Sequence, residues 1–114
     1  MKTKILDVSR YTEETIRNAA VFSDEEAKEI VEDAEEKIRF AAEILRNGGL
    51  VAFPTETVYG IGADALNEEA VSHVYEAKGR PSDNPMIVHI ARASDVSLLT
   101  DSLTPQLVKL ADTF

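Results

Sequence analysis

Residues 49–62 read GLVAFPTETVYGIG, and this stretch decides the fold of the chain. Its apolar residues 50–53 predict a short strand that Pro54 ends, and a polar, glycine-rich loop follows at once. A second loop of this kind, KGRPSDNP at residues 78–85, precedes a second apolar run, MIVHI at residues 86–90. Because open α/β sheets bind their ligands at polar loops at the ends of buried strands, these two loops are where we expect a binding site.

Lys78 and Arg80 are the only lysine or arginine residues between Asn47 and Ala91. A Lys-x-Arg pair is most often a pair of scattered surface charges. Here the pair is expected to end a helix and to enter a proline-bounded loop before a strand. Arginine offers a bidentate fork and lysine a mobile point charge, so this context favours a site for phosphate or carboxylate.

Composition excludes several classes of function. The chain has 114 residues, enough for at most one domain, and its net charge of −9 argues against broad binding to nucleic acid. Cysteine is absent, and the two histidines show no metal-ligand spacing, so no metal site is expected on the protein. We find no apolar run long enough to span a bilayer and no signal-peptide pattern. A cytoplasmic protein without membrane contact is the simplest expectation.

Helical periodicity is clearest over residues 24–47. Ser23 and Glu26 form a capping-box pattern at its start, and Gly48 supplies its stop. In the helix expected over residues 67–77, His73 lies outside the apolar stripe, so we expect it at the surface. The other helices are expected over residues 12–20, over residues 67–77 with Ala70, Val71, Val74 and Tyr75 facing inward, and after the capping residues Ser94 and Thr104.

Strands are few by comparison. Residues 4–8 suggest an edge strand, which makes about three strands for four or five helices. The helix that Thr104 begins has no stop signal. We therefore expect an α/β (α+β) fold, a twisted mixed sheet with packed helices, that is apparently truncated: residues 1–114 would be the N-terminal portion of one domain, with residues 1–22 as an N-terminal extension. Bare strand edges and apolar surface would favour self-association of such a chain.

Two phrases resemble the YrdC-like family of threonylcarbamoyl-AMP synthases: RNGGLVAFPTETVYGIGADA at residues 46–65 and AKGRPSDNPMIVHI at residues 77–90. The resemblance implies a YrdC-like mixed α/β sheet. It also implies synthesis of L-threonylcarbamoyl-AMP from L-threonine, bicarbonate and ATP, with release of pyrophosphate. A separate transferase would then modify adenosine 37 of tRNA, so that tRNA is only an indirect partner.

The resemblance also implies roles for single residues. Taken from the residues alone, Thr55 could simply cap a turn after Pro54, and His89 could be a packed histidine in its strand. Mg²⁺ would be held mainly by the ATP phosphates rather than by side chains. By resemblance, the catalytic residues are Lys78 and Arg80, which also contact the nucleotide. The resemblance places Thr55, Tyr59 and His89 in the threonine site. It places Ser82 and Asn84 at the border of the nucleotide.

Three alternatives remain open at this point. The first is a related carbamoyltransferase module, which uses the same fold with carbamoyl phosphate. The second is a non-enzymatic RNA-binding module, which the net charge of −9 disfavours. The third is an inactive fragment of the synthase.

Overall fold

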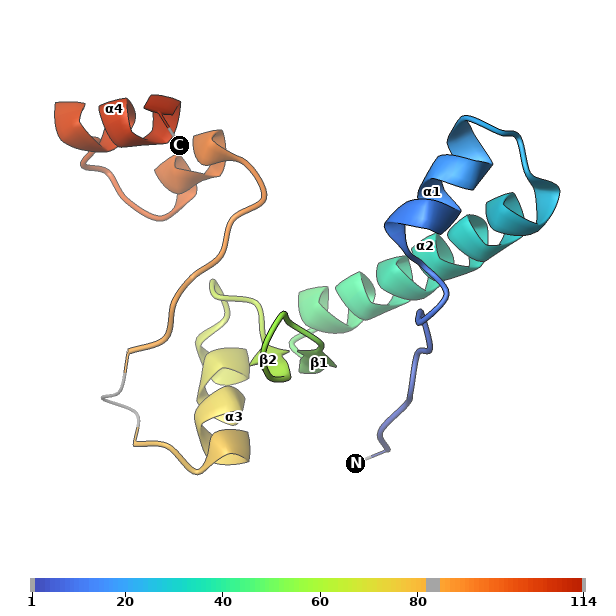
Figure 1. The fold of residues 1–114 in the computed structure, drawn as a ribbon. Helices are drawn as coiled ribbons and strands as arrows, with labels where there is room; N and C mark the ends of the chain where they lie inside the picture. The colour runs from blue at the N-terminus through green and yellow to red at the C-terminus, as the bar shows by residue number, and fades with distance from the viewer. Residues whose placement is uncertain (1, 82–84, 114) are drawn as a thin grey trace. The chain divides into compact units, whose positions relative to one another are not determined.

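The computed structural model describes residues 2–81 and 85–113. The chain forms two compact units, Met1–Ser82 and Asp83–Phe114, which are described separately below. The first contains three helices and a small sheet, and the second contains only helical elements within its described part (Figure 1). The expected mixture of helices with a sheet is confirmed.

The N-terminal part of the first unit is a pair of packed helices, α1 (Glu13–Ala20) and α2 (Glu25–Arg46) (Figure 1). The side chain of Thr12 caps α1 by accepting the N–H of Thr15 at 3.2 Å. Asp24 caps α2, because its carboxylate accepts the N–H of Ala27 at 3.2 Å. The expected Ser23 capping box is therefore wrong: Ser23 has a φ of 51° and belongs to the turn that joins the two helices.

Helix α2 ends in a glycine-dependent reversal, as its sequence predicted. Gly48 has a φ of 84°, in the left-handed region that favours glycine. Its N–H donates to the carbonyl oxygen of Leu45 at 3.1 Å, and the N–H of Gly49 donates to that of Ile44 at 2.8 Å. These two bonds make a Schellman motif, which satisfies the last carbonyls of α2 and turns the chain toward the first strand.

Substituting Gly49 by alanine is expected to lower the free energy of unfolding by about 1–3 kcal/mol. A Cβ at this position would lie 2.5 Å from Ile44 Cγ2 and 2.9 Å from the Ile44 carbonyl oxygen, and the helix backbone has little room to move. Urea denaturation followed by circular dichroism measures the change. Gly62→Ala is the matched control, since its Cβ would meet only the movable ring of Phe53, at 3.2 Å. Equal losses for both variants would contradict this account.

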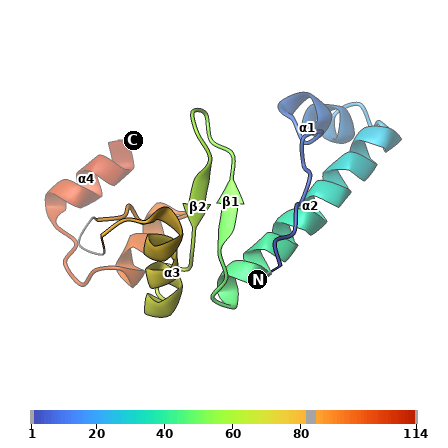
Figure 2. The ribbon, with the colours of Figure 1, turned by 90° about the horizontal axis from the view of Figure 1, so that it is seen from below.

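Strands β1 (Val51–Phe53) and β2 (Gly60–Gly62) form an antiparallel hairpin (Figure 2). Val51 lies opposite Gly62, and Phe53 lies opposite Gly60. The aromatic ring of Phe53 covers both glycines, because a Cβ on Gly60 would come within 2.9 Å of Phe53 Cε2. The sequence had predicted β1 but interpreted the residues of β2 as loop. Cross-strand packing of the ring over the glycines explains why this weak strand-former pairs.

Helix α3 (Glu68–Lys78) follows the hairpin and carries the residues of greatest interest. Asn67 caps it as predicted, by accepting the N–H of Ala70 at 3.1 Å. Ala70 and Val74 are buried, with 1% and 2% of their surface exposed, while His73 is exposed as expected. One face of α3 is thus anchored in the first unit.

Two expected strands are absent from the described residues. Residues 4–8 and 86–90 adopt no regular secondary structure there, and the only ladder in the described part of the chain joins β1 to β2. A strand needs a partner to satisfy its backbone, so an apolar run alone does not make one. The N-terminal segment is held by side chains instead: Lys37 Nζ donates to the Asp7 carbonyl oxygen at 2.8 Å, and Lys4 Nζ lies 4.3 Å from the centroid of the Phe40 ring.

The second unit contains a 3-10 helix, η1 (Ala93–Leu98), and helix α4 (Pro105–Thr113). The predicted Thr104 cap is confirmed, since its hydroxyl accepts the N–H of Leu107 at 3.1 Å. The predicted Ser94 cap is wrong. The N-cap residue is Arg92, and its N–H donates to the Asp95 carboxylate at 3.2 Å. Across the described residues, no helix of either unit combines the length and apolar character needed to cross a bilayer.

Candidate functional site

The candidate site begins where α3 ends. Lys78 is the last residue of α3, and Gly79 follows with φ 63° and ψ 27°. The Gly79 N–H donates to the Glu76 carbonyl oxygen at 3.2 Å, and the Arg80 N–H donates to the Tyr75 carbonyl oxygen at 3.1 Å. This is a second Schellman motif. It fastens the backbone of Arg80 to the last turn of α3, so both cations are carried by one helix end.

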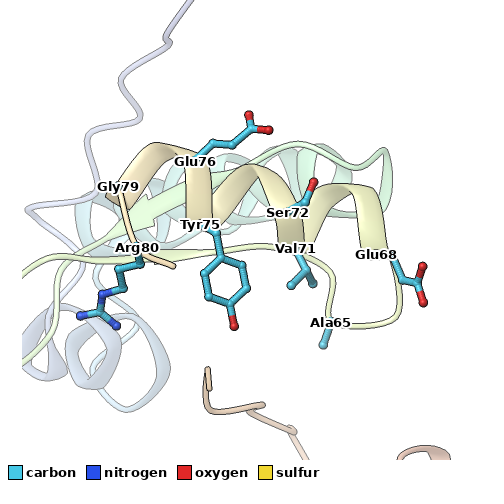
Figure 3. Close-up of a pocket in the computed structure, with 8 residues that line it drawn as sticks. All are labelled: Ala65, Glu68, Val71, Ser72, Tyr75, Glu76, Gly79 and Arg80. Atoms are coloured by element: carbon cyan, nitrogen blue, oxygen red, sulfur yellow. The ribbon is translucent and has the colours of Figure 1, made fainter. Parts of the chain in front are cut away.

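A cavity of about 600 Å³ lies along one side of α3. Figure 3 shows the Tyr75 ring and the Arg80 side chain on the same side of the helix. Small-molecule sites are commonly of this size, with mostly apolar walls and a few polar groups. The residues that line the cavity are Ala65, Glu68, Val71, Ser72, Tyr75, Glu76, Gly79 and Arg80.

The sequence had placed Val71 and Tyr75 in the core together with Ala70 and Val74. The structure separates the two pairs: Ala70 and Val74 are buried, whereas Val71 and Tyr75 are partly exposed and face the cavity. Each pair is spaced four residues apart, and the pairs are offset by one residue, about 100° around the helix. The apolar stripe of α3 is wider than its buried face by the positions of Val71 and Tyr75. This extra width was the signal in the sequence for a second face that lines a cavity.

Neither Lys78 nor Arg80 makes an ion pair with any residue that the structure describes, and both are exposed. On α2 the situation differs. Lys37 Nζ lies 2.7 Å from Asp33 Oδ2, and Arg39 lies 3.8 Å from Glu35. Cations at a helix C-terminus interact favourably with the helix dipole but remain solvated. The donors of Lys78 and Arg80 are thus available to an anion.

Thr55 and Tyr59 lie in the loop of the β1–β2 hairpin, outside the residues that line the cavity. The Thr55 hydroxyl donates to the Val58 carbonyl oxygen and accepts the N–H of Thr57 at 3.3 Å. It therefore performs the turn-capping role that the sequence allowed. Tyr59 is 78% exposed. A role of either residue in binding threonine stays a prediction.

The remaining predicted site residues are distributed differently. His89 belongs to the second unit, where it is exposed in an irregular segment, so its expected place in an apolar strand is wrong. Ser82 and Asn84 lie outside the described residues. Of the predicted site residues that the structure describes, only Arg80 lines the cavity, with Lys78 two positions before it.

The family model described as "Telomere recombination", Sua5/YciO/YrdC, matches residues 43–114. The chain belongs to the Sua5/YciO/YrdC family. The matched range contains β1, β2, α3 and the Lys78–Arg80 pair, while α1 and most of α2 precede it.

Several members of this family resemble the chain closely over part of their length. A threonylcarbamoyl-AMP synthase of Pyrococcus abyssi is 54% identical over 78 residues, which make up 68% of this chain and 23% of that protein. Its counterpart in Bacillus subtilis is 61% identical over 69 residues, or 60% of this chain and 19% of that protein. The chain therefore spans about a quarter or less of these curated relatives.

Solved structures of the family share the fold. Pyrococcus abyssi Sua5, crystallised in complex with L-threonine, has a TM-score of 0.64 at 54% identity, over 70% of this chain and 24% of that one. A doubly substituted variant of the same protein gives a TM-score of 0.65 over the same shares. The expected YrdC-like fold is thus confirmed for the matched part.

Proposed function

We propose that this chain provides part of an L-threonylcarbamoyl-AMP synthase, an enzyme that makes L-threonylcarbamoyl-AMP from L-threonine, bicarbonate and ATP. The observation that carries the proposal is its 54% and 61% identity to two proteins named threonylcarbamoyl-AMP synthase. The complex of Pyrococcus abyssi Sua5 with L-threonine supports the choice of amino acid. The product would serve a separate transferase that modifies tRNA, so this chain would meet tRNA only indirectly.

The chemistry needs no nucleophilic side chain. The threonine amine attacks bicarbonate, and loss of water gives a carbamate. A carbamate oxygen then attacks the α-phosphorus of ATP. The bond between this phosphorus and the oxygen that bridges it to the β-phosphorus breaks, and pyrophosphate leaves. The carbamate is unstable in water, so the site must exclude solvent and align the two reactants.

The residues needed most are cations, because a carboxylate, a carbamate and a triphosphate meet in one place. Lys78 and Arg80 would offset this repulsion and stabilise the charge that develops on the phosphate oxygens. Their exposure and lack of ion pairs among the described residues suit this role. Thr55, Tyr59 and His89 would contact threonine, and Ser82 and Asn84 the nucleotide.

Mg²⁺ would enter with ATP, which supplies most of its oxygen ligands. When bound, the ion would neutralise phosphate charge beside the two cations.

A cytoplasmic location is part of the same proposal. The proposal also treats the chain as one domain with residues 1–22 as an N-terminal extension. The family match begins only at residue 43.

The direct test measures pyrophosphate release by the purified native protein with ATP, Mg²⁺, bicarbonate and L-threonine. Release that requires all three substrates, with threonylcarbamoyl-AMP identified by mass, is the expected result. A second arm transplants the matched 78-residue segment into the Pyrococcus abyssi synthase. The proposal fails if the native protein forms no product and the chimera is also inactive although correctly folded.

A further inference from the structure

We infer that Gly79 is a positioning residue, whose left-handed backbone sets Arg80 against the cavity beside α3. The inference rests on the proposed function, in which Arg80 binds the nucleotide. It goes beyond that function by assigning a role to the residue between the two cations.

The first step is the geometry of the reversal. With φ at 63° and ψ at 27°, Gly79 lies in the left-handed region, where an L-residue brings its Cβ too close to the next carbonyl oxygen. Only this conformation allows both closing bonds, from the Gly79 N–H to Glu76 and from the Arg80 N–H to Tyr75. The bond made by Arg80 is therefore a consequence of the conformation of Gly79.

The second step is what the reversal does to the two cations. Lys78 still belongs to α3, whereas Arg80 is turned back toward the helix and lines the cavity with Tyr75 (Figure 3). The backbone of Arg80 is fixed to the last turn of α3, because its N–H donates to the Tyr75 carbonyl oxygen. The side chain of Arg80 therefore extends from an ordered backbone position, which reduces the conformational entropy lost when the guanidinium binds a phosphate.

The third step is that Gly79 has no packing role. A Cβ built on Gly79 meets no atom within 4 Å among the residues that the structure describes. Alanine at this position would act only through the backbone conformation. Asparagine, which tolerates the left-handed region, would largely restore it.

The chain offers a matched control at Gly48. Gly48 has the same left-handed conformation and closes the same motif at the end of α2, but no cation pair surrounds it. Gly48→Ala should destabilise the protein at least as much as Gly79→Ala, because its Cβ would also lie 3.2 Å from Nδ2 of Asn67, the N-cap residue of α3. Only Gly79→Ala should affect a ligand that Arg80 holds.

The experiment measures the Kd for Mg·ATP by isothermal titration calorimetry on the native protein and on four variants: Gly79→Ala, Gly79→Asn, Gly48→Ala and Arg80→Ala. We expect Gly79→Ala to weaken binding about fivefold to tenfold, and Gly79→Asn and Gly48→Ala to stay within about twofold of the native protein. Thermal denaturation should give Gly48→Ala a loss in Tm at least as large as that of Gly79→Ala.

Each outcome decides a different question. Native affinity in Gly79→Ala, together with loss of binding in Arg80→Ala, overturns the role of Gly79 and leaves the proposed function standing. Equal weakening by Gly48→Ala also overturns it, because the effect would then be general destabilisation. If the native protein itself binds no Mg·ATP, the proposed function fails and the role of Gly79 fails with it.

Discussion

Arg80→Ala is expected to slow threonine-dependent release of pyrophosphate about 10²- to 10³-fold in the native protein, a loss of about 2.7–4 kcal/mol of transition-state stabilisation. Arg80 lines the cavity, and no ion pair with a described residue competes for its guanidinium. Removing it leaves charge on the phosphate oxygens without a bidentate donor as the carbamate attacks. Lys78→Ala is expected to have an effect of the same order.

Steady-state kinetics with circular dichroism measure this prediction. Both side chains are exposed, so neither substitution should unfold the protein. Arg39→Ala is the control, because Arg39 is an exposed arginine on α2 that lies 3.8 Å from Glu35 and outside the family match. Near-native turnover by both Lys78→Ala and Arg80→Ala would refute the assignment of these residues.

Selectivity for L-threonine over L-valine is expected to reach a factor on the order of 10⁴ in kcat/KM. The two amino acids have nearly the same shape, but a site built to pair the threonine hydroxyl leaves its own polar groups unpaired when valine binds. Thr55 is the residue proposed to contact the substrate. Its hydroxyl already engages the Val58 carbonyl oxygen and the Thr57 N–H, which holds it at a fixed place in the hairpin loop.

Competition between the two amino acids in the pyrophosphate assay tests this selectivity. Thr55→Val removes the hydroxyl at constant volume and should reduce the discrimination, while Thr55→Ser keeps the hydroxyl and should preserve it. Equal kcat/KM values for L-threonine and L-valine in the native protein would rule out a hydroxyl-specific site.

The sequence by itself determined the helices, the strand at β1 and the position of the cation pair. Helical periodicity and capping residues are local properties, so Thr12, Asn67 and Thr104 were correctly predicted to start helices. Glycines at the helix ends are equally local, because the left-handed conformation is available to Gly48 whatever surrounds it. The family phrases, which lie in residues 46–90, pointed to the family, because such motifs are also local in the sequence.

Tertiary structure alone decided which apolar residues pack and which runs pair. Residues 4–8 and 86–90 have strand-like sequences, yet no partner strand lies beside them among the described residues. The sequence predicted a loop at Gly60–Gly62, but these residues form strand β2, because the ring of Phe53 covers Gly60 and Gly62. Val71 and Tyr75 were predicted to lie in the core, but they line the cavity, because α3 buries only one narrow face. Pairing and burial depend on neighbours distant in sequence, and periodicity carries no information about which neighbours are present.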